Sequence, residues 1–431
     1  MTAAGTPPSV QPAEDCVLSL YQLLDPEVLA NPYPLYHKLR SQDPVHWDPF
    51  LHAWVVTRYS DVVHVLHHFS ANRTPTPEQL SALNLSALNP IAEVMVRQML
   101  FLDPPDHTRL RALASAAFTP RRVEKLRSHI QEVMDTLLDR VVSQGTMDVI
   151  ADFAGPAPAI VTAELLGVST GDHVQLREWS QDFAEMLGNF QHNPERFPRV
   201  LRSVENLRSY FRSELRTQQT HPRDGLVHAM MTAEIDGARL SEEEVIANLI
   251  VTMVGGQETT TNLIGNGVLT LLRHPAELAR LRGDPSLIPS AVEELLRYES
   301  PSQHTARLSS ADVELGGRRI RKRQAVIAVL GAGNRDPERF PEPDRLDITR
   351  HDNRHLAFGW AAHFCFGAAL ARLEGQIAFD TILRRLPQLQ LNAQGPLVWR
   401  HNLGLRGLTS LPVAFAASDP KRNLVLRPGT G

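Results

Sequence analysis

The stretch that decides the interpretation is Phe358-Gly359-Trp360-Ala361-Ala362-His363-Phe364-Cys365-Phe366-Gly367, called the cysteine loop below. A helix-forming segment, residues 368–374, follows directly. A helix N-terminus stabilises negative charge and lowers a thiol pKa, and small residues let a flat cofactor approach the backbone. The loop is therefore a candidate site for a metal-bound thiolate, although a lone cysteine is more often a buried structural residue.

The residue types of this loop suit a haem iron whose axial ligand is the thiolate of Cys365. Such a ligand donates electron density to the iron and favours O–O cleavage. Phe358 is expected to pack beside the sulfur and limit water access. Zinc is the poorer alternative, because no second cysteine lies nearby to build a tetrahedral site. The candidate metal ligand is Cys365, and the candidate haem contacts in the loop are Phe358, Gly359 and Gly367.

The composition excludes several classes of protein. The chain has 431 residues, for which length alone predicts two or three domains. Its net charge of −4 indicates neither a nucleic-acid nor an anionic-membrane partner. Two cysteines argue against a disulfide framework and fit a reducing compartment. We see no stretch near the roughly 18 apolar residues of a membrane span, so we expect no membrane anchor and a cytoplasmic protein.

The hydrophobic pattern predicts a mainly α fold with a small β-rich region. Residues 1–18 are expected to be a disordered tail. A helix is expected over residues 32–41, and a strand pair over residues 45–47 and 54–57. A further β patch is expected over residues 313–329, with a hairpin turn at Gly316-Gly317. Pro, Gly and Asp separate helices through most of the remaining chain.

A long buried helix is predicted from residue 242 to about residue 272. Ser241 and Glu244 form a capping box at its start, and its apolar residues surround most of the helix. Gly255-Gly256 in its middle removes side chains and makes room for a ligand, at a cost of about 1 kcal/mol each. Glu258 and Thr259 follow in the same groove and are candidate proton-delivery residues. The alternative is a helix-packing notch with Glu258 in a salt bridge elsewhere.

Charged residues form two more candidate groups. Glu294 and Arg297 share one helix face; if buried they need a third partner, for which Arg345 is the candidate. If exposed, they are an ordinary solvated pair. A second group could hold a carboxylate by charge-assisted bonds, although each member alone is more often surface charge. Its members are His107, Arg111, Arg307 and His355.

Together these segments resemble a soluble bacterial cytochrome P-450, from about residue 21 to about residue 413. The order and spacing of the cysteine loop, the Glu-x-x-Arg helix and the Gly-x-Glu-Thr helix carry the resemblance. Four further segments agree with it: Asn31-Pro32-Tyr33-Pro34, Trp54-Val55-Val56-Thr57-Arg58-Tyr59, Asp103-Pro104-Pro105-Asp106-His107-Thr108 and Asn334-Arg335-Asp336-Pro337. One departure lies in the loop itself, where Ala361 replaces the usual Gly. Another is Gly255 in place of the usual Ala.

The resemblance implies a single haem domain over residues 19–431, a helical bundle around haem b (iron protoporphyrin IX), which overrides the length-based estimate. It implies that Cys365 binds the iron and that Glu258 and Thr259 deliver protons to bound dioxygen. It also implies that Glu294, Arg297 and Arg345 form a structural triad behind the cysteine loop. The residues implied to grip the haem propionates are His107, Arg111, Arg307 and His355.

The implied function is that of a haem-thiolate monooxygenase acting on a lipophilic small molecule by hydroxylation or epoxidation. The chain has no flavin or nicotinamide fingerprint, so a ferredoxin and its reductase are the expected electron donors to a monomer. A peroxide-driven peroxygenase and a non-catalytic haem-binding sensor are the alternatives. Expected pocket walls are residues 85–99, 248–256 and 302–306. The candidate pocket residues are Asn248, Thr252, Gly255, Gly256 and Gln303.

Overall fold

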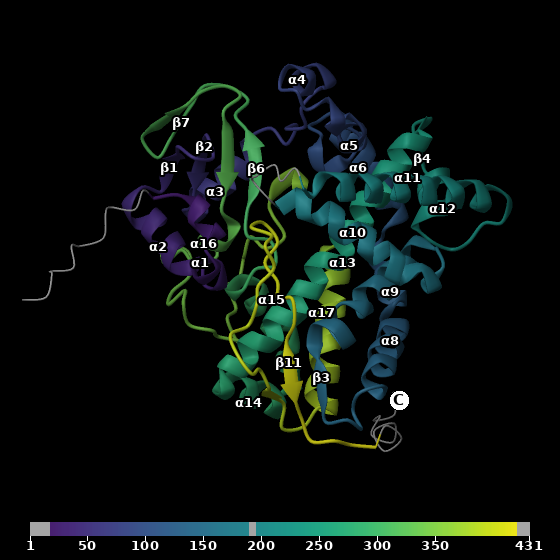
Figure 1. Cartoon of the computed structure of the whole chain (residues 1–431), viewed down its shortest axis with the longest axis vertical. Coiled ribbons are helices and arrows are strands. Elements are labelled where there is room, and N and C mark those ends of the chain that lie inside the picture. Colours follow the sequence, from purple (N-terminus) through teal and green to yellow (C-terminus); the bar gives the residue numbers. More distant parts are fainter. Residues whose placement is uncertain (1–17, 189–194, 420–431) are drawn as a thin grey trace, which may run out of the picture.

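Helices make up 57% of the computed structural model, which confirms the mainly α prediction. The structure describes residues 18–188 and 195–419, so the predicted tail lies outside the described residues except for Leu18. Figure 1 shows the helices gathered around α13, with the small sheets at the edges. The first helices in chain order are α1 (Pro26–Ala30), α2 (Tyr33–Gln42), α3 (Tyr59–His68), α4 (Pro77–Ala82), α5 (Asn89–Met95), α6 (Asp106–Ala117), α7 (Pro120–Lys125), α8 (Arg127–Asp139) and α9 (Pro156–Leu166).

The helices of the second half contain most of the residues discussed below. They are α10 (His173–Gly188), α11 (Phe197–Thr220), α12 (Leu226–Thr232), α13 (Glu242–Arg273), α14 (Pro275–Gly283), α15 (Ile288–Tyr298), α16 (Leu330–Gly333) and α17 (Ala368–Arg385). Two short turns matter for the argument, the π-turn η4 (Val149–Ala154) and the 3-10 turn η7 (Ala361–His363).

The largest sheet has the order β1-β2-β9-β6. Its strands are β1 (Val45–Asp48), β2 (Ala53–Val56), β6 (Thr305–Leu308) and β9 (Ala325–Ala328). β1 and β2 form the expected hairpin, β9 runs parallel to β2 with Val55 opposite Ile327, and β6 is antiparallel to β9. This sheet brings β9 against the helix α3 and pairs β6 with β9, so segments from distant parts of the sequence lie next to one another.

Smaller sheets complete the β part. β3 (Thr146–Asp148), β10 (Gln390–Leu391) and β11 (Pro412–Ala414) form one sheet, and β4 (Glu234–Ile235) pairs with β5 (Ala238–Arg239). β7 (Val313–Leu315) pairs with β8 (Arg318–Ile320) across Gly316 and Gly317, whose φ values are +54° and +73°. Both glycines adopt the left-handed conformation that a tight hairpin turn requires, which confirms the predicted turn.

Helix α13 crosses the interior and is about 48 Å long at 1.5 Å per residue. The backbone N–H of Ser241 donates to the Glu244 carboxylate (2.8 Å), and the Glu244 N–H donates to the Ser241 hydroxyl (3.3 Å). The predicted capping box is therefore present. α13 contacts α9, α10, α11, α15 and α17. A helix surrounded on so many sides needs apolar residues around most of its circumference, as its sequence has.

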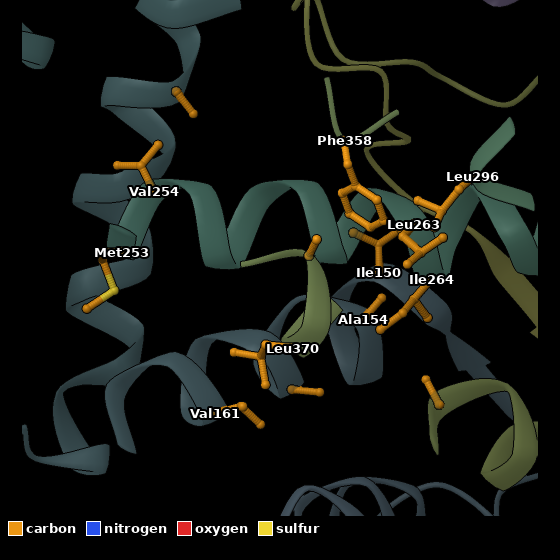
Figure 2. Packing of buried hydrophobic residues seen from close by; sticks show 14 of the residues in the cluster. Ile150, Ala154, Val161, Met253, Val254, Leu263, Ile264, Leu296, Phe358 and Leu370 are labelled. Carbon is orange, nitrogen blue, oxygen red and sulfur yellow. The ribbon is translucent and has the colours of Figure 1, made fainter. Parts of the chain in front are cut away.

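One large hydrophobic cluster joins these helices, and a smaller one fills the space between α3 and the largest sheet. Figure 2 shows Leu263 of α13, Leu296 of α15 and Phe358 of the cysteine loop gathered in the large cluster. The same three residues line one cavity. The core therefore fixes the cysteine loop relative to the long central helix.

One segment differs from the sequence-based expectation about membranes. Residues Val149–Leu166 reach the length and mean hydropathy (1.4) of a membrane span, although 72% of the segment is buried in the protein. It consists of η4, Gly155 and α9, which pack against α8 and α13. Its apolar character is explained by its place in the core, and the expectation that the chain contains no such stretch was wrong.

Candidate active site

The cysteine loop ends directly before α17, with Cys365 three residues before the first residue of the helix, and its backbone holds Cys365 in place. The Cys365 N–H donates to the Phe358 carbonyl oxygen (2.8 Å), and the Cys365 carbonyl oxygen accepts from the Ala368 N–H (3.4 Å). Removal of the sulfur from solvent raises the pKa of the Cys365 thiol, against smaller lowering effects of the Gly367 N–H, Arg111 and Arg372. A metal ion bound at the sulfur would reverse this balance, because it stabilises the thiolate directly.

A cavity of about 340 Å³ separates the cysteine loop from α13. The loop side includes Phe358, Gly359, Cys365 and Gly367, and the opposite side includes a row of small residues. A Cβ added at Gly255 would meet nothing within 4 Å, whereas one at Gly256 would lie 2.9 Å from the Thr162 hydroxyl oxygen. Gly255 therefore widens the cavity, and Gly256 lets α9 pack closely. The α13 residues that line it are Val251, Thr252, Val254, Gly255, Gly256, Thr259, Thr260 and Leu263.

Cationic and imidazole side chains collect at one edge of this cavity. Arg111, Arg307 and His363 line it, and the buried ring of His107 lies 4.2 Å from the ring of His363, centroid to centroid. Burial, together with Arg307 and His107, lowers the pKa of His363 to about 3. Burial also lowers the pKa of Arg307, to about 10. His363, two residues before the cysteine, was missed by the sequence reasoning, and its only signal was its place in the loop.

His355 is not part of this group. It is buried, but its Nε2 lies 3.2 Å from the Glu293 carboxylate and its Nδ1 accepts from the Ala357 N–H (3.2 Å). Glu293 is also held by Arg372 (2.7 and 2.8 Å). His355 does not line the cavity, so the structure corrects the prediction that it faces a propionate. The imidazole in that position belongs to His363.

The residues present fit a haem. Both ring nitrogens of His107 and the Nε of Arg307 are buried without a hydrogen-bond partner in the part of the chain that the structure describes. Buried polar groups without partners are costly, and propionate carboxylates would satisfy them. The described residues contain no cluster of three His, Cys, Asp or Glu that could hold a metal ion. A single cysteine that faces the cavity therefore needs a macrocycle to supply the other metal ligands.

The two proposed proton-delivery residues point to different places. The Thr259 hydroxyl donates to the Gly255 carbonyl oxygen (2.7 Å), one turn earlier, and Thr259 lines the cavity. Glu258 is buried, does not line the cavity, and forms an ion pair with Arg400, with Arg177 nearby. For Glu258 the structure shows the arrangement given above as the alternative, a salt bridge elsewhere, whereas Thr259 faces the cavity as the proton-delivery prediction requires.

Comparison with known proteins decides the family. The Cytochrome P-450 family model matches residues 48–397. The chain belongs to the cytochrome P-450 family. It is 40% identical over 394 residues to the biotin biosynthesis cytochrome P-450 of Bacillus subtilis, covering 90% of this chain and 97% of the relative.

Two further matches agree. Over 390 residues the chain is 36% identical to the 6-deoxyerythronolide B hydroxylase of Saccharopolyspora erythraea, covering 88% of this chain and 95% of that one. A crystal structure of the cytochrome P-450 BioI with an acyl carrier protein that carries hexadec-9Z-enoic acid has a TM-score of 0.84 at 39% identity. It covers 90% of this chain and all of that one. The protein is therefore a cytochrome P-450 monooxygenase with haem b as its cofactor.

The Glu-x-x-Arg pair of this P-450 is fully buried. Arg297 Nε and NH2 donate to the two Glu294 carboxylate oxygens, each at 2.8 Å, and neither side chain is exposed. The third partner is Arg350, whose Nε lies 3.2 Å from Glu294 Oε2. Arg345 was the wrong candidate: its side chain is 60% exposed and pairs with Glu342 and Asp347. It contributes only its carbonyl oxygen, which accepts from Arg297 at 3.2 Å.

Two predicted pocket residues of the P-450 lie outside the cavity. Asn248 ties α13 to the segment before α6, since its Oδ1 accepts from the Met99 N–H (2.9 Å) and its Nδ2 donates to the Arg97 carbonyl (2.9 Å). The Gln303 amide donates to the Ser300 carbonyl (2.7 Å), and its side chain lies against Gly331. Neither lines the cavity, whereas Thr252, Gly255 and Gly256 do. In the segment that leads into β6, the neighbouring residues Ser302 and His304 line the cavity instead of Gln303.

Ala361, which replaces the usual glycine of the P-450 loop, has a φ of +58°. A non-glycine residue in the left-handed region strains the folded protein by about 1–2 kcal/mol. Glycine avoids this strain, but it destabilises the fold by about 0.4–1 kcal/mol because it gives the unfolded chain more conformational freedom. We expect Ala361→Gly to stabilise the fold by a fraction of a kcal/mol to about 1 kcal/mol. That raises the thermal midpoint by on the order of 1–2 °C in a chain of this size.

Ala362 provides the matched control, because it is not among the described residues with positive φ. Ala362→Gly should lower the thermal midpoint of the haem-loaded protein, since glycine there only adds freedom to the unfolded chain. Calorimetry measures both midpoints. Equal shifts in the two variants would show that the positive φ of Ala361 does not destabilise the fold.

Proposed function

We propose that this P-450 inserts one oxygen atom of dioxygen into a lipophilic small molecule, by hydroxylation or epoxidation, with electrons from a ferredoxin and its reductase. We propose further that it works as a cytoplasmic monomer with one haem domain over residues 19–431. The observation that carries the oxygenase assignment is the Thr259 hydroxyl in the cavity wall, with the buried carboxylate of Glu258 beside it in sequence. A peroxide-driven enzyme needs no such pair, because peroxide brings its own protons and oxygen.

In this proposal Cys365 would bind the haem iron through its sulfur, and His107, Arg111, Arg307 and His363 would hold the propionates. The haem, when bound, supplies dioxygen binding and O–O cleavage. Thr259 accepts and donates a proton at its hydroxyl without leaving α13, since the Gly255 carbonyl orients it. Glu258 carries the proton from the protein surface. To do so, its carboxylate must leave its ion pair with Arg400 and form a hydrogen bond with water or with Thr259.

The cavity favours an apolar substrate. Its walls include Leu66, Met99, Leu187, Val251 and Leu405, and its polar residues are mostly hydroxyl side chains apart from the cations at its edge. A mostly apolar pocket with a few polar groups suits a lipophilic molecule. The relatives support this class, because they are named for biotin biosynthesis and for hydroxylation of 6-deoxyerythronolide B.

The face beside the cysteine loop supports docking of an electron donor. Phe364, next to the ligand, is 38% exposed, and the Arg111 guanidinium donates to its carbonyl oxygen (2.6 Å). Arg121 is exposed on the nearby α7, whereas Arg372 pairs with Glu293. An acidic ferredoxin would meet an aromatic residue with cations around it, an arrangement that steers association. The BioI structure with an acyl carrier protein supports a carrier protein as a second type of partner.

Replacing Thr259 tests the proton route. We expect Thr259→Ala to consume reductant at a similar rate but to release much more of it as hydrogen peroxide, because protons no longer arrive in order. The measurement is peroxide and product formed per electron pair, with dioxygen and a ferredoxin–reductase pair. Product formation should fall by about 10²-fold to 10³-fold, the range typical of losing a positioned proton donor.

Thr252→Ala is the matched control. Thr252 lies in the same cavity wall, and its hydroxyl also donates one turn back, to the Asn248 carbonyl oxygen (2.7 Å). It lacks a neighbouring acid, so coupling should stay at the wild-type level. Unchanged coupling in Thr259→Ala would contradict the proton route. Turnover of the wild type on peroxide alone, without loss in Thr259→Ala, would favour the peroxygenase. No turnover under either condition would favour a haem-binding sensor.

A further inference from the structure

A second cavity of about 390 Å³ adjoins the haem-side cavity. The two share Arg73, Leu187, His304 and Thr305 in their walls, so these residues form the junction. The remaining walls of the second cavity are mostly apolar. They come from α4, α5, the end of α10 and the segment between α5 and α6, and they include Leu80, Ile91, Met95 and Phe101. The prediction that residues 85–99 form a pocket wall fits this second cavity.

Arg73 is the one charged side chain among the described residues that line the second cavity. Its guanidinium lies 4.6 Å above the Phe101 ring, and its NH1 donates to the Ala71 carbonyl oxygen (3.2 Å). The described residues provide no carboxylate partner for it. Burial and the neighbouring Arg307 lower the pKa of Arg73 to about 9, so it remains cationic at neutral pH. A half-buried cation that faces a mostly apolar cavity and has no carboxylate partner among the described residues favours an anionic ligand.

Thr74 adds a second polar group at the same place. It is only 8% exposed, lines the second cavity, and its hydroxyl oxygen has no hydrogen-bond partner in the described part of the chain. A hydroxyl can donate one hydrogen bond, and Arg73 has N–H groups to spare. Both donors suit the two oxygens of one carboxylate.

We propose that Arg73 and Thr74 bind the carboxylate of the substrate, so that this P-450 oxidises apolar carboxylic acids. The proposal rests on the monooxygenase function above and names its substrate class. The carboxylate lies in the second cavity, and the apolar body crosses the junction toward Gly255 and Thr259. Oxidation therefore falls on a carbon remote from the carboxyl group.

A haem propionate is the other possible source of a carboxylate for Arg73. Arg111, Arg307 and His363 line only the haem-side cavity, and together with His107 they already face that cofactor. Thr74 lines only the second cavity. Arg73 lines both cavities and lies close enough to His363 to contribute to the lowering of its pKa, so the unpartnered hydroxyl of the adjacent Thr74 is the observation that favours the substrate over the cofactor.

The test is calorimetric titration of the haem-loaded protein with straight-chain acids of eight to eighteen carbons and with the corresponding primary alcohols. The wild type should bind at least one acid more tightly than its alcohol. Arg73→Leu should weaken that acid by about 10-fold to 100-fold, the loss of a charge-assisted pair. Alcohol binding should stay within about twofold, because the apolar contacts that carry it remain. Arg73→Lys should weaken acid binding less than Arg73→Leu does. Thr74→Val should weaken acid binding by about threefold to tenfold.

Leu88→Ala is the control, because it enlarges the second cavity without touching the cation and should affect acid and alcohol alike. The proposal is overturned if no acid binds more tightly than its alcohol, or if Arg73→Leu weakens both equally. Loss of haem from both Arg73→Leu and Arg73→Lys would overturn it in favour of a propionate contact. Acid binding that depends on Arg73 in a protein without dioxygen-dependent turnover would uphold the site and refute the monooxygenase function separately.

Discussion

Replacing Arg297 by alanine should yield protein that is haem-free or insoluble. The change leaves the Glu294 carboxylate with fewer cations in a fully buried place, and it removes the donors that reach the Asn334 and Pro343 carbonyl oxygens (2.8 Å each). Breaking a buried ion pair by removing one partner costs about 3–5 kcal/mol. That is a large part of the roughly 5–15 kcal/mol by which most proteins are stable. Haem content of the soluble fraction and the unfolding midpoint in urea measure the effect.

Arg345→Ala is the matched control for this prediction. Its side chain is 60% exposed and pairs with surface acids, so its loss should change stability by less than about 1 kcal/mol. Arg350→Ala should lie between the two, because Arg350 is mostly buried and contacts Glu294 at 3.2 Å. Normal haem loading in Arg297→Ala would show that the pair is dispensable. A larger loss in Arg345→Ala than in Arg350→Ala would restore the partner expected from the sequence.

The second large effect is expected from Cys365→Ser. Serine is nearly isosteric and keeps the N–H bond to the Phe358 carbonyl oxygen (2.8 Å), so the fold should persist. It does not supply the electron-donating sulfur that favours O–O cleavage. Dioxygen-dependent product formation should fall below about 10⁻³ of the wild-type rate, a barrier increase of at least about 4 kcal/mol. Product yield at matched haem content, with a ferredoxin–reductase pair, measures it.

The other cysteine, Cys16, serves as the control, although it lies outside the described residues. Cys16→Ser should keep full turnover and the same visible spectrum. If Cys365→Ser oxygenates the substrate at a rate near that of the wild type, the Cys365 sulfur is not required for the reaction. Loss of the fold in Cys365→Ser, seen as a lowered unfolding midpoint of the haem-free protein, would mean that the thiol has a structural role as well.

Local sequence patterns predicted the features that depend on neighbouring residues. The capping box of α13 needs only Ser241 and Glu244, three residues apart, and it is present. The hairpin at Gly316-Gly317 needs only two residues that tolerate positive φ. Glu294 and Arg297 lie about one helical turn apart, so their contact could be predicted from the sequence. Their burial could not, because it depends on segments elsewhere in the chain.

The features that were missed depend on segments far apart in the chain. Arg350 was passed over for Arg345 because the loop after Pro343 turns the second arginine inward and leaves the first in solvent. His355 was a wrong candidate because the sequence does not reveal Glu293, which binds His355 from α15. The Arg400 partner of Glu258 lies 142 residues away. Distant partners of this kind are set by tertiary packing and leave no periodic signal.

The central claim is that sulfur from Cys365 binds the haem iron. Absorption of the dithionite-reduced, carbon monoxide-bound wild type tests it most directly, because the position of the main band depends on the ligand opposite carbon monoxide. A strongly red-shifted band, lost in Cys365→Ser, is the predicted result. A band at the unshifted position typical of imidazole ligation, unchanged in Cys365→Ser, would contradict the assignment.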